Sequence, residues 1–222
     1  MVNNFRDDTI LEMLQKPVEI FAGIMPLKRT LFTNRTFLRR CRKIDAVELR
    51  LLMIKNRNFL SKWLQPQPEV LRLESVVKLI VEDQMLAKKG VRLDLGIFDA
   101  ITTEMIGKIA LHSVDYGIQR SGLVSYWLDE DKVGKGYMTE ALATLVSFAF
   151  EEACLHRVNV KISADNETSL SLVKKLGFVQ EGLERKSLFV NGKWCDALLF
   201  GLLDDEYDAR ADSWMENGWL GC

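Results

Sequence analysis

Cysteine and histidine are scarce in this sequence. Among its 222 residues are four cysteines, Cys41, Cys154, Cys195 and Cys222, and two histidines. No two cysteines have the C-x-x-C spacing of zinc sites and dithiol redox centres, and four are too few for a disulfide scaffold in a chain of this length. We therefore predict free thiols and no metal site.

A long apolar run and an excess of charge are also absent. The run from Ala141 to Phe150 is interrupted by Thr144 and Ser147, and it is shorter than the about 20 residues that a membrane helix needs. The 30 lysines and arginines nearly balance the 31 aspartates and glutamates, so no overall field attracts nucleic acid or an anionic membrane. The acidic start, with Asp7 and Asp8, is not typical of a signal peptide. These absences predict a soluble cytoplasmic protein that binds neither nucleic acid nor membranes directly.

What is present indicates one packed domain with extensions. Hydrophobic residues make up 48% and charged residues 27% of the chain, as in ordinary globular proteins. The length suffices for one well-cored domain. Pro17 and Pro26 interrupt a weak helical pattern near the start, so we assign residues 1–29 to an N-terminal extension.

Apolar spacing predicts helices and strands in a mixed order. Helical spacing occurs over Asp45–Leu52, Asn58–Leu64 and Glu74–Lys89, and again from Gly136 to about Ala149. Short strands are expected over Thr36–Cys41, Arg92–Phe98, Met105–Val114, Gly122–Leu128 and Arg157–Ile162. A helix capped by Asp165 or Asn166 should end at Gly177, and Asn191-Gly192 predicts a hairpin between strands over 178–190 and 193–203.

The segment WLDEDKVGKGYMT, from Trp127 to Thr139, carries the chemical information. A predicted strand runs through a glycine loop directly into a helix, whose free N–H groups and dipole favour a bound anion. Gly134 and Gly136 would let a pyrophosphate approach the backbone, and Lys132 and Lys135 add positive charge locally. On its own the loop is equally compatible with a plain turn before a helix.

The same loop excludes two other phosphate-binding motifs. It lacks the Gly-Lys followed by Ser or Thr of the Walker pattern, and Thr139 stands where the G-x-G-x-x-G fingerprint needs its third glycine. Kinases and dehydrogenases are therefore disfavoured.

At this point the chain resembles the GNAT acetyltransferases, whose acetyl-CoA loop has the pattern Gln/Arg-x-x-Gly-x-Gly/Ala; here that window is VGKGYM, Val133 to Met138. Asn34 to Arg39 resembles the first strand of the ribosomal-protein N-terminal (alanine/serine) acetyltransferase branch, the RimJ/RimL-like enzymes. Further motifs follow in the order of that branch: TEAL at 139–142, LHRV at 155–158, DNETS at 165–169, LGF at 176–178, EG at 181–182 and NGK at 191–193. The resemblance covers the chain from about Thr33 to Tyr207.

The resemblance implies an α+β fold, the GNAT acyl-CoA N-acyltransferase fold. Its central sheet is twisted, mostly antiparallel, splayed between the fourth and fifth strands, and flanked by helices. It implies a GNAT acetyltransferase domain over residues 30–208 and a C-terminal tail over 209–222. The implied enzyme is an acyltransferase that passes acetyl from the co-substrate acetyl-CoA directly to a primary amine, the N-terminal α-amine of a protein such as a ribosomal protein. It uses no metal, and a homodimer is left open.

The resemblance also assigns the site. Similar enzymes bind acetyl-CoA through the splayed strand, the loop and the DNxxS segment, which here are Trp127, Leu128, Val133, Gly134, Lys135, Gly136, Tyr137, Met138, Thr139 and Asn166. The implied catalytic residues are Asn166 and Ser169, with the serine near the thiolate leaving group. The structural alternative is that Asn166 only caps a helix and Ser169 only lies in its first turn.

Several points depart from the family pattern. Val133 replaces a Gln or Arg, Met138 replaces a smaller residue, and Leu188 stands where some relatives have a carboxylate base. Candidate bases by predicted proximity are Glu104, His112, Asp115 and Tyr126. Two other functions stay open: acetylation of a small amine such as a polyamine, an antibiotic or an amino acid, and a non-catalytic acetyl-CoA-binding module.

Overall fold

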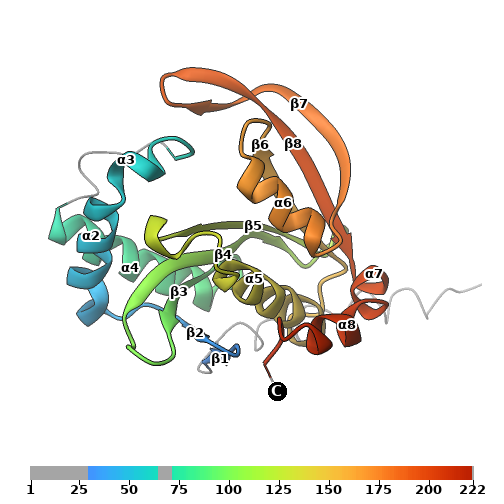
Figure 1. Ribbon diagram of the computed structural model, residues 1–222, viewed down its shortest axis with the longest axis horizontal. Coiled ribbons are helices and arrows are strands. Elements are labelled where there is room, and N and C mark those ends of the chain that lie inside the picture. Colours follow the sequence, from blue (N-terminus) through green and yellow to red (C-terminus); the bar gives the residue numbers. More distant parts are fainter. Residues whose placement is uncertain (1–29, 65–71, 222) are drawn as a thin grey trace, which may run out of the picture.

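The computed structural model describes residues 30–64 and 72–221, so the extension predicted over residues 1–29 lies outside the described part. The described residues form one eight-stranded sheet in the order β1-β2-β3-β4-β5-β6-β8-β7 (Figure 1). Its strands are β1 Leu31–Phe32, β2 Thr36–Arg39, β3 Leu93–Asp99, β4 Met105–Asp115, β5 Ser121–Leu128, β6 Arg157–Ser163, β7 Val179–Val190 and β8 Lys193–Leu203.

Helices lie between and after these strands. They are α2 Ala46–Lys55, α3 Arg57–Leu60, α4 Leu73–Lys88, α5 Tyr137–Ser147, α6 Glu167–Lys175, α7 Asp204–Asp208 and α8 Ala211–Glu216, with short 3-10 turns η1 Lys43–Asp45 and η3 Glu130–Lys132. A π-helical turn, η4 Phe148–Glu152, continues α5. The predicted helix over Asn58–Leu64 is shorter than expected, since α3 ends at Leu60.

The sheet confirms the predicted GNAT topology. β3, β4 and β5 form the expected antiparallel meander. β5 and β6 run parallel and pair only over Ser121–Val124 and Arg157–Val160, so the rest of β5 diverges from β6. This is the splay expected between the fourth and fifth strands; they become β5 and β6 because the structure has an additional first strand, β1.

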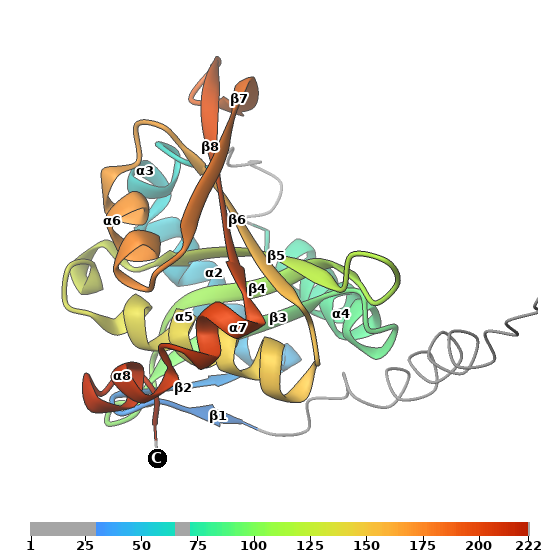
Figure 2. The same ribbon diagram turned by 90° about the vertical axis from the view of Figure 1, so that its right-hand side faces the viewer.

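Two apolar clusters lie on opposite faces of the sheet, because side chains alternate between faces along a strand. α5 and α6 cover one face, where Leu142 and Val173 pack with Ile109 of β4. α2 and α4 cover the other face, where Leu49 and Ile80 pack in a smaller cluster that Trp127 contacts. Figure 2 shows these layers from the side.

The hairpin and the residues after it complete the domain. Asn191 and Gly192 both have positive φ, 51° and 76°, as the predicted type I′ turn requires, and the β7–β8 arm projects beyond the body of the sheet (Figure 2). Trp214 of α8 is only 1% exposed and meets the Tyr207 ring at a centroid distance of 5.4 Å. The C-terminal residues therefore add to the apolar core. None of the helices within the described ranges is long and apolar enough to cross a membrane.

Candidate active site

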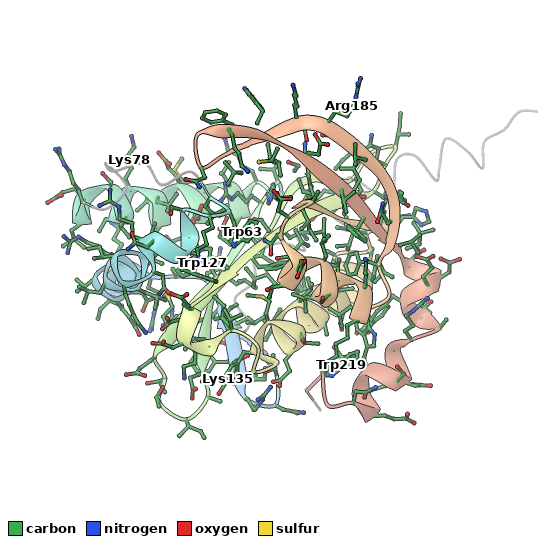
Figure 3. All side chains as sticks on the ribbon, turned by 45° about the horizontal axis from the view of Figure 1, so that its top comes forward. Trp63, Lys78, Trp127, Lys135, Arg185 and Trp219 are labelled. Atoms are coloured by element: carbon green, nitrogen blue, oxygen red, sulfur yellow. The ribbon has the colours of Figure 1, made fainter. Side chains whose placement is uncertain are left out.

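A cavity of about 500 Å³ opens beside the end of β5. It is bounded by the α3 wall, which we define as residues 59–64, by the end of β5, by the glycine loop, which we define as residues 133–136, and by the start of α6. Figure 3 shows Trp63 and Trp127 close together at the centre of the molecule, with Lys135 near the start of α5. The predicted site residues that line the cavity are Trp127, Leu128, Val133, Gly134, Gly136, Tyr137, Met138, Thr139, Asn166 and Ser169. Lys135 is exposed and lies outside this lining.

The glycine loop delivers the N-terminus of α5 to the cavity. Gly134 and Gly136 have φ values of 75° and 84°, and Gly136 is the N-cap of α5. This left-handed backbone strains any residue with a Cβ, so it accounts for both glycines. The first turn of α5, from Tyr137 to Thr139, faces the cavity. This geometry, with free N–H groups at a helix start beside a cavity, is of the kind that favours a bound anion, and anion binding stays a prediction.

A buried carboxylate holds this helix start in place. Glu140 is 4% exposed and accepts hydrogen bonds from Arg35 Nε at 2.7 Å and from Thr33 Oγ1 at 3.0 Å. The Arg35 guanidinium also lies 4.6 Å from the centre of the Tyr137 ring. The β1–β2 turn therefore clamps the start of α5. Sequence reasoning missed this support, although Arg35 and Glu140 both lie in the quoted motifs.

The start of α6 forms the opposite side of the cavity. Asn166 is the N-cap of α6, and its Oδ1 accepts a hydrogen bond from the Ser169 backbone N–H at 3.2 Å. Both residues also line the cavity. Because both residues line the cavity while Asn166 caps the helix, a structural role and a role toward a ligand are compatible here.

Comparison with known proteins decides the family. Residues 35–179 match the model of the acetyltransferase (GNAT) domain, which is more than half of the chain. The chain belongs to the GNAT acetyltransferase family. The predicted recognition and fold are thereby confirmed, and the protein is an N-acetyltransferase by family.

Individual relatives agree with this assignment. The chain is 33% identical to the Bacillus subtilis protein named "Probable N-acetyltransferase YjcK", over 73% of this chain and 91% of the relative. It is 28% identical to the Escherichia coli [ribosomal protein uS5]-alanine N-acetyltransferase, over 81% of this chain and 93% of the relative. The solved structure of Mycobacterium smegmatis RimJ in complex with CoA-disulfide superposes with a TM-score of 0.81 at 24% identity, covering 87% of this chain and 97% of that one.

Within this GNAT acetyltransferase, Tyr126 of β5 is the candidate base that lines the cavity. Its hydroxyl oxygen is buried and has no hydrogen-bond partner among the described residues. Burial raises the pKa of Tyr126 to about 12, and the Ser169 hydroxyl, which lies beside it without reaching hydrogen-bond geometry, opposes that rise only in part. A phenol of this pKa keeps its proton near neutral pH, so it does not serve as a base.

The other three base candidates lie away from the cavity lining. Glu104 is exposed on the β3–β4 turn. His112 is half-buried, and burial lowers its pKa. Asp115 accepts backbone hydrogen bonds from Gly117 and Gln119 at 2.8 and 3.1 Å, which is a turn-forming role. Among residues 30–64 and 72–221, no group of three or more His, Cys, Asp or Glu could hold a metal ion.

The α3 wall is tied to the glycine loop from outside the cavity. Asn56, between α2 and α3, is 2% exposed; its Oδ1 accepts the Glu130 N–H at 2.9 Å and its Nδ2 donates to the Leu52 carbonyl at 3.0 Å. Lys55 Nζ lies 2.7 Å from Asp129 Oδ2 and 2.6 Å from Asp131 Oδ2. We call Lys55 and Asn56, with their partners in 129–131, the η3 clasp. It fixes the wall against the turn that precedes the loop.

Proposed function

We propose that this enzyme transfers acetyl from acetyl-CoA directly to the N-terminal α-amine of a protein, such as a ribosomal protein. The observation that carries the proposal is the continuity of the cavity, whose lining includes both the glycine loop and the α3 wall. A thioester carried in from the loop and an amine entering past Trp63 would meet beside the end of β5. Proximity of the two reactants is what direct transfer requires.

The glycine loop is suited to the pyrophosphate of acetyl-CoA. The amides from Gly134 to Met138 supply donors whatever their side chains, so Val133 and Met138 do not disable the loop. The backbone of Trp127 and Leu128 lies where β5 has left β6, and the pantetheine arm can pair with it as an added strand. The RimJ structure in complex with CoA-disulfide supports a CoA ligand in this fold. Asn166 would contact the cofactor from the start of α6.

The chemistry of direct transfer can be assigned to few groups. The neutral amine nitrogen forms a bond to the acetyl carbonyl carbon and the C–S bond breaks. The thiolate takes a proton from the Ser169 hydroxyl, and the proton that the nitrogen loses returns to the Ser169 oxygen through water. No cysteine belongs to the described lining of the cavity. Cys195 lies on β8 opposite Leu188, so an acyl-enzyme is disfavoured.

The lining favours an α-amine over a polyamine or an aminoglycoside. Among the described lining residues are Lys62, Lys132 and Lys175, but no carboxylate and no histidine. A polycation would meet like charges there, and no base stands ready to deprotonate the amine. An α-amine with a pKa of about 8 is roughly one-tenth neutral at pH 7, whereas an alkylamine with a pKa of about 10.4 is neutral in roughly one molecule in 2,500. Given such an acceptor, we expect a cytoplasmic enzyme.

Mass spectrometry tests this proposal with both acceptor classes present. A cell lysate whose own acetyl-CoA has been removed is incubated with isotope-labelled acetyl-CoA and the enzyme, and labelled peptides and metabolites are identified. The expected result is label on protein N-termini, and its absence from lysine side chains and polyamines. Label confined to small amines would contradict the acceptor assignment, and acetyl-CoA binding without any turnover would support the non-catalytic module instead.

A further inference from the structure

The Tyr126 hydroxyl is a buried polar group without a hydrogen-bond partner in the wall of the cavity. The side chain lines the cavity, but its Oη is buried and lacks a hydrogen-bond partner among the described residues. Buried polar groups in native proteins are nearly always paired, and each exception calls for an explanation such as a bound ligand. Leaving this hydroxyl unpaired costs free energy that Phe at the same position would not.

The position of Tyr126 relates the hydroxyl to the reacting group. Tyr126 directly precedes Trp127, whose backbone lies on the diverging part of β5. The Ser169 side chain, from the start of α6, lies beside the Tyr126 phenol. Two residues with hydroxyl groups, Tyr126 on β5 and Ser169 on α6, therefore contribute to the lining of the same cavity.

We propose that the Tyr126 hydroxyl donates a hydrogen bond to the carbonyl oxygen of the acetyl thioester. The inference rests on the proposed function, because it needs an acyl-CoA in the cavity. A carbonyl oxygen is a far better hydrogen-bond acceptor than a thioester sulfur. The two hydroxyls therefore have different roles: Tyr126 donates a hydrogen bond to the carbonyl oxygen, and Ser169 protonates the sulfur as it leaves.

The proposed bond helps the reaction without transferring a proton. As the C–N bond forms, negative charge grows on the carbonyl oxygen, and the phenol O–H strengthens its hydrogen bond to that oxygen. When the C–S bond breaks, the charge leaves with the sulfur and the phenol still holds its proton. The raised pKa of Tyr126 suits this role, because a donor must stay protonated throughout.

Binding measurements on Tyr126→Phe test the proposal without a known acceptor. The dissociation constants of acetyl-CoA and of CoA are measured by calorimetry for the wild type and the variant. CoA lacks the carbonyl, so we expect its affinity to change less than twofold, while acetyl-CoA binds about threefold to tenfold more weakly to the variant, as for one lost neutral hydrogen bond. The ligand-free variant should melt at the same temperature as the wild type or higher, because it has lost an unpaired hydroxyl.

Thr144→Val provides the matched control. Thr144 of α5 also carries a buried hydroxyl without a hydrogen-bond partner in the described structure, but it does not line the cavity. Its replacement should leave the affinities for both ligands unchanged. Equal weakening of CoA and acetyl-CoA by Tyr126→Phe, or weakening of neither, overturns the inference but leaves the proposed function standing. A wild type that binds neither ligand overturns both.

Discussion

At the scale of single residues, the left-handed backbone of Gly136 predicts that a side chain at this position weakens acetyl-CoA binding. Gly136→Ala places a Cβ where φ is 84° and where it lies 3.0 Å from the Arg35 guanidinium. Because the helix start must shift to relieve this, acetyl-CoA affinity should fall by about tenfold, which corresponds to the about 1–2 kcal/mol cost of a left-handed residue. Calorimetric titration measures the change.

Gly192→Ala is the control for this substitution. Gly192 has nearly the same φ, 76°, and a Cβ there meets nothing within 4 Å. It lies in the β7–β8 turn, away from the cavity lining. The control should lose similar stability yet keep its affinity. An equal loss of affinity in both variants would mean that general destabilisation, and not the loop, explains the result.

Ser169→Ala separates the two roles of the start of α6. Asn166 caps the helix through the Ser169 backbone N–H, which alanine retains, so folding should be unaffected. If the hydroxyl protonates the leaving thiolate, turnover falls by about tenfold to a thousandfold while acetyl-CoA affinity is kept. Steady-state kinetics and calorimetry together check this, and undiminished turnover would leave Ser169 as a first-turn residue only.

Some of these residues could be foreseen and others could not. Gly134 and Gly136 were predictable from the local sequence, because glycines in a short loop before a helix often mark positions of positive φ. The sequence singles out Tyr126 only as one of four candidate bases, within the predicted strand over Gly122–Leu128. Its distinguishing property is a buried, unpaired oxygen, and that depends on packing between β5 and α6, which no local pattern encodes.

At the scale of elements, the η3 clasp should decide how firmly the α3 wall is held. Asn56→Ala removes a buried acceptor from the Glu130 N–H, at a cost of about 1–3 kcal/mol. Relative to the wild type, we expect Asn56→Ala to increase the rate of hydrogen exchange over residues 57–64 and to leave the rate over β3 and β4 unchanged. Hydrogen–deuterium exchange followed by mass spectrometry measures this.

The neighbouring Asn58 serves as the comparison, because its side chain is exposed. Asn58→Ala should leave exchange over 57–64 unchanged. If Asn56→Ala also leaves it unchanged, the clasp does not hold the wall.

Elements with strong local signals were predictable, and those defined by long-range pairing were not. Asn191-Gly192 specifies its hairpin, and the apolar stripe from Met138 onward specifies α5, so both were predicted correctly. β1 was missed because two residues carry no periodicity, and they form a strand only by pairing with Phe37 and Leu38 of β2. α3 ends early because Ser61 to Leu64 form turns that the apolar spacing does not distinguish from a helix.

At the scale of the whole molecule, the C-terminal residues test where the domain ends. Trp214 is 1% exposed within the main apolar cluster, so Trp214→Ala should lower the free energy of unfolding by about 3–5 kcal/mol. Trp194, at 60% exposure, is the comparison, and its replacement by alanine should cost far less. Urea unfolding of both variants measures the difference. Equal, small effects would support a domain that ends near residue 208, as the family resemblance implied.

The short pairing of β5 with β6 divides the sheet into two halves. Four residue pairs, from Ser121 to Val124 on β5, join the half that contains β1 to β5 to the half that contains β6, β8 and β7. The halves diverge where the chemistry is proposed to occur, so a ligand bound between them would contact both and hold them together. Its stabilising effect should grow with its concentration, by about 2.7 kcal/mol at one hundred times its dissociation constant. The melting temperature of the enzyme should therefore rise with the concentration of acetyl-CoA.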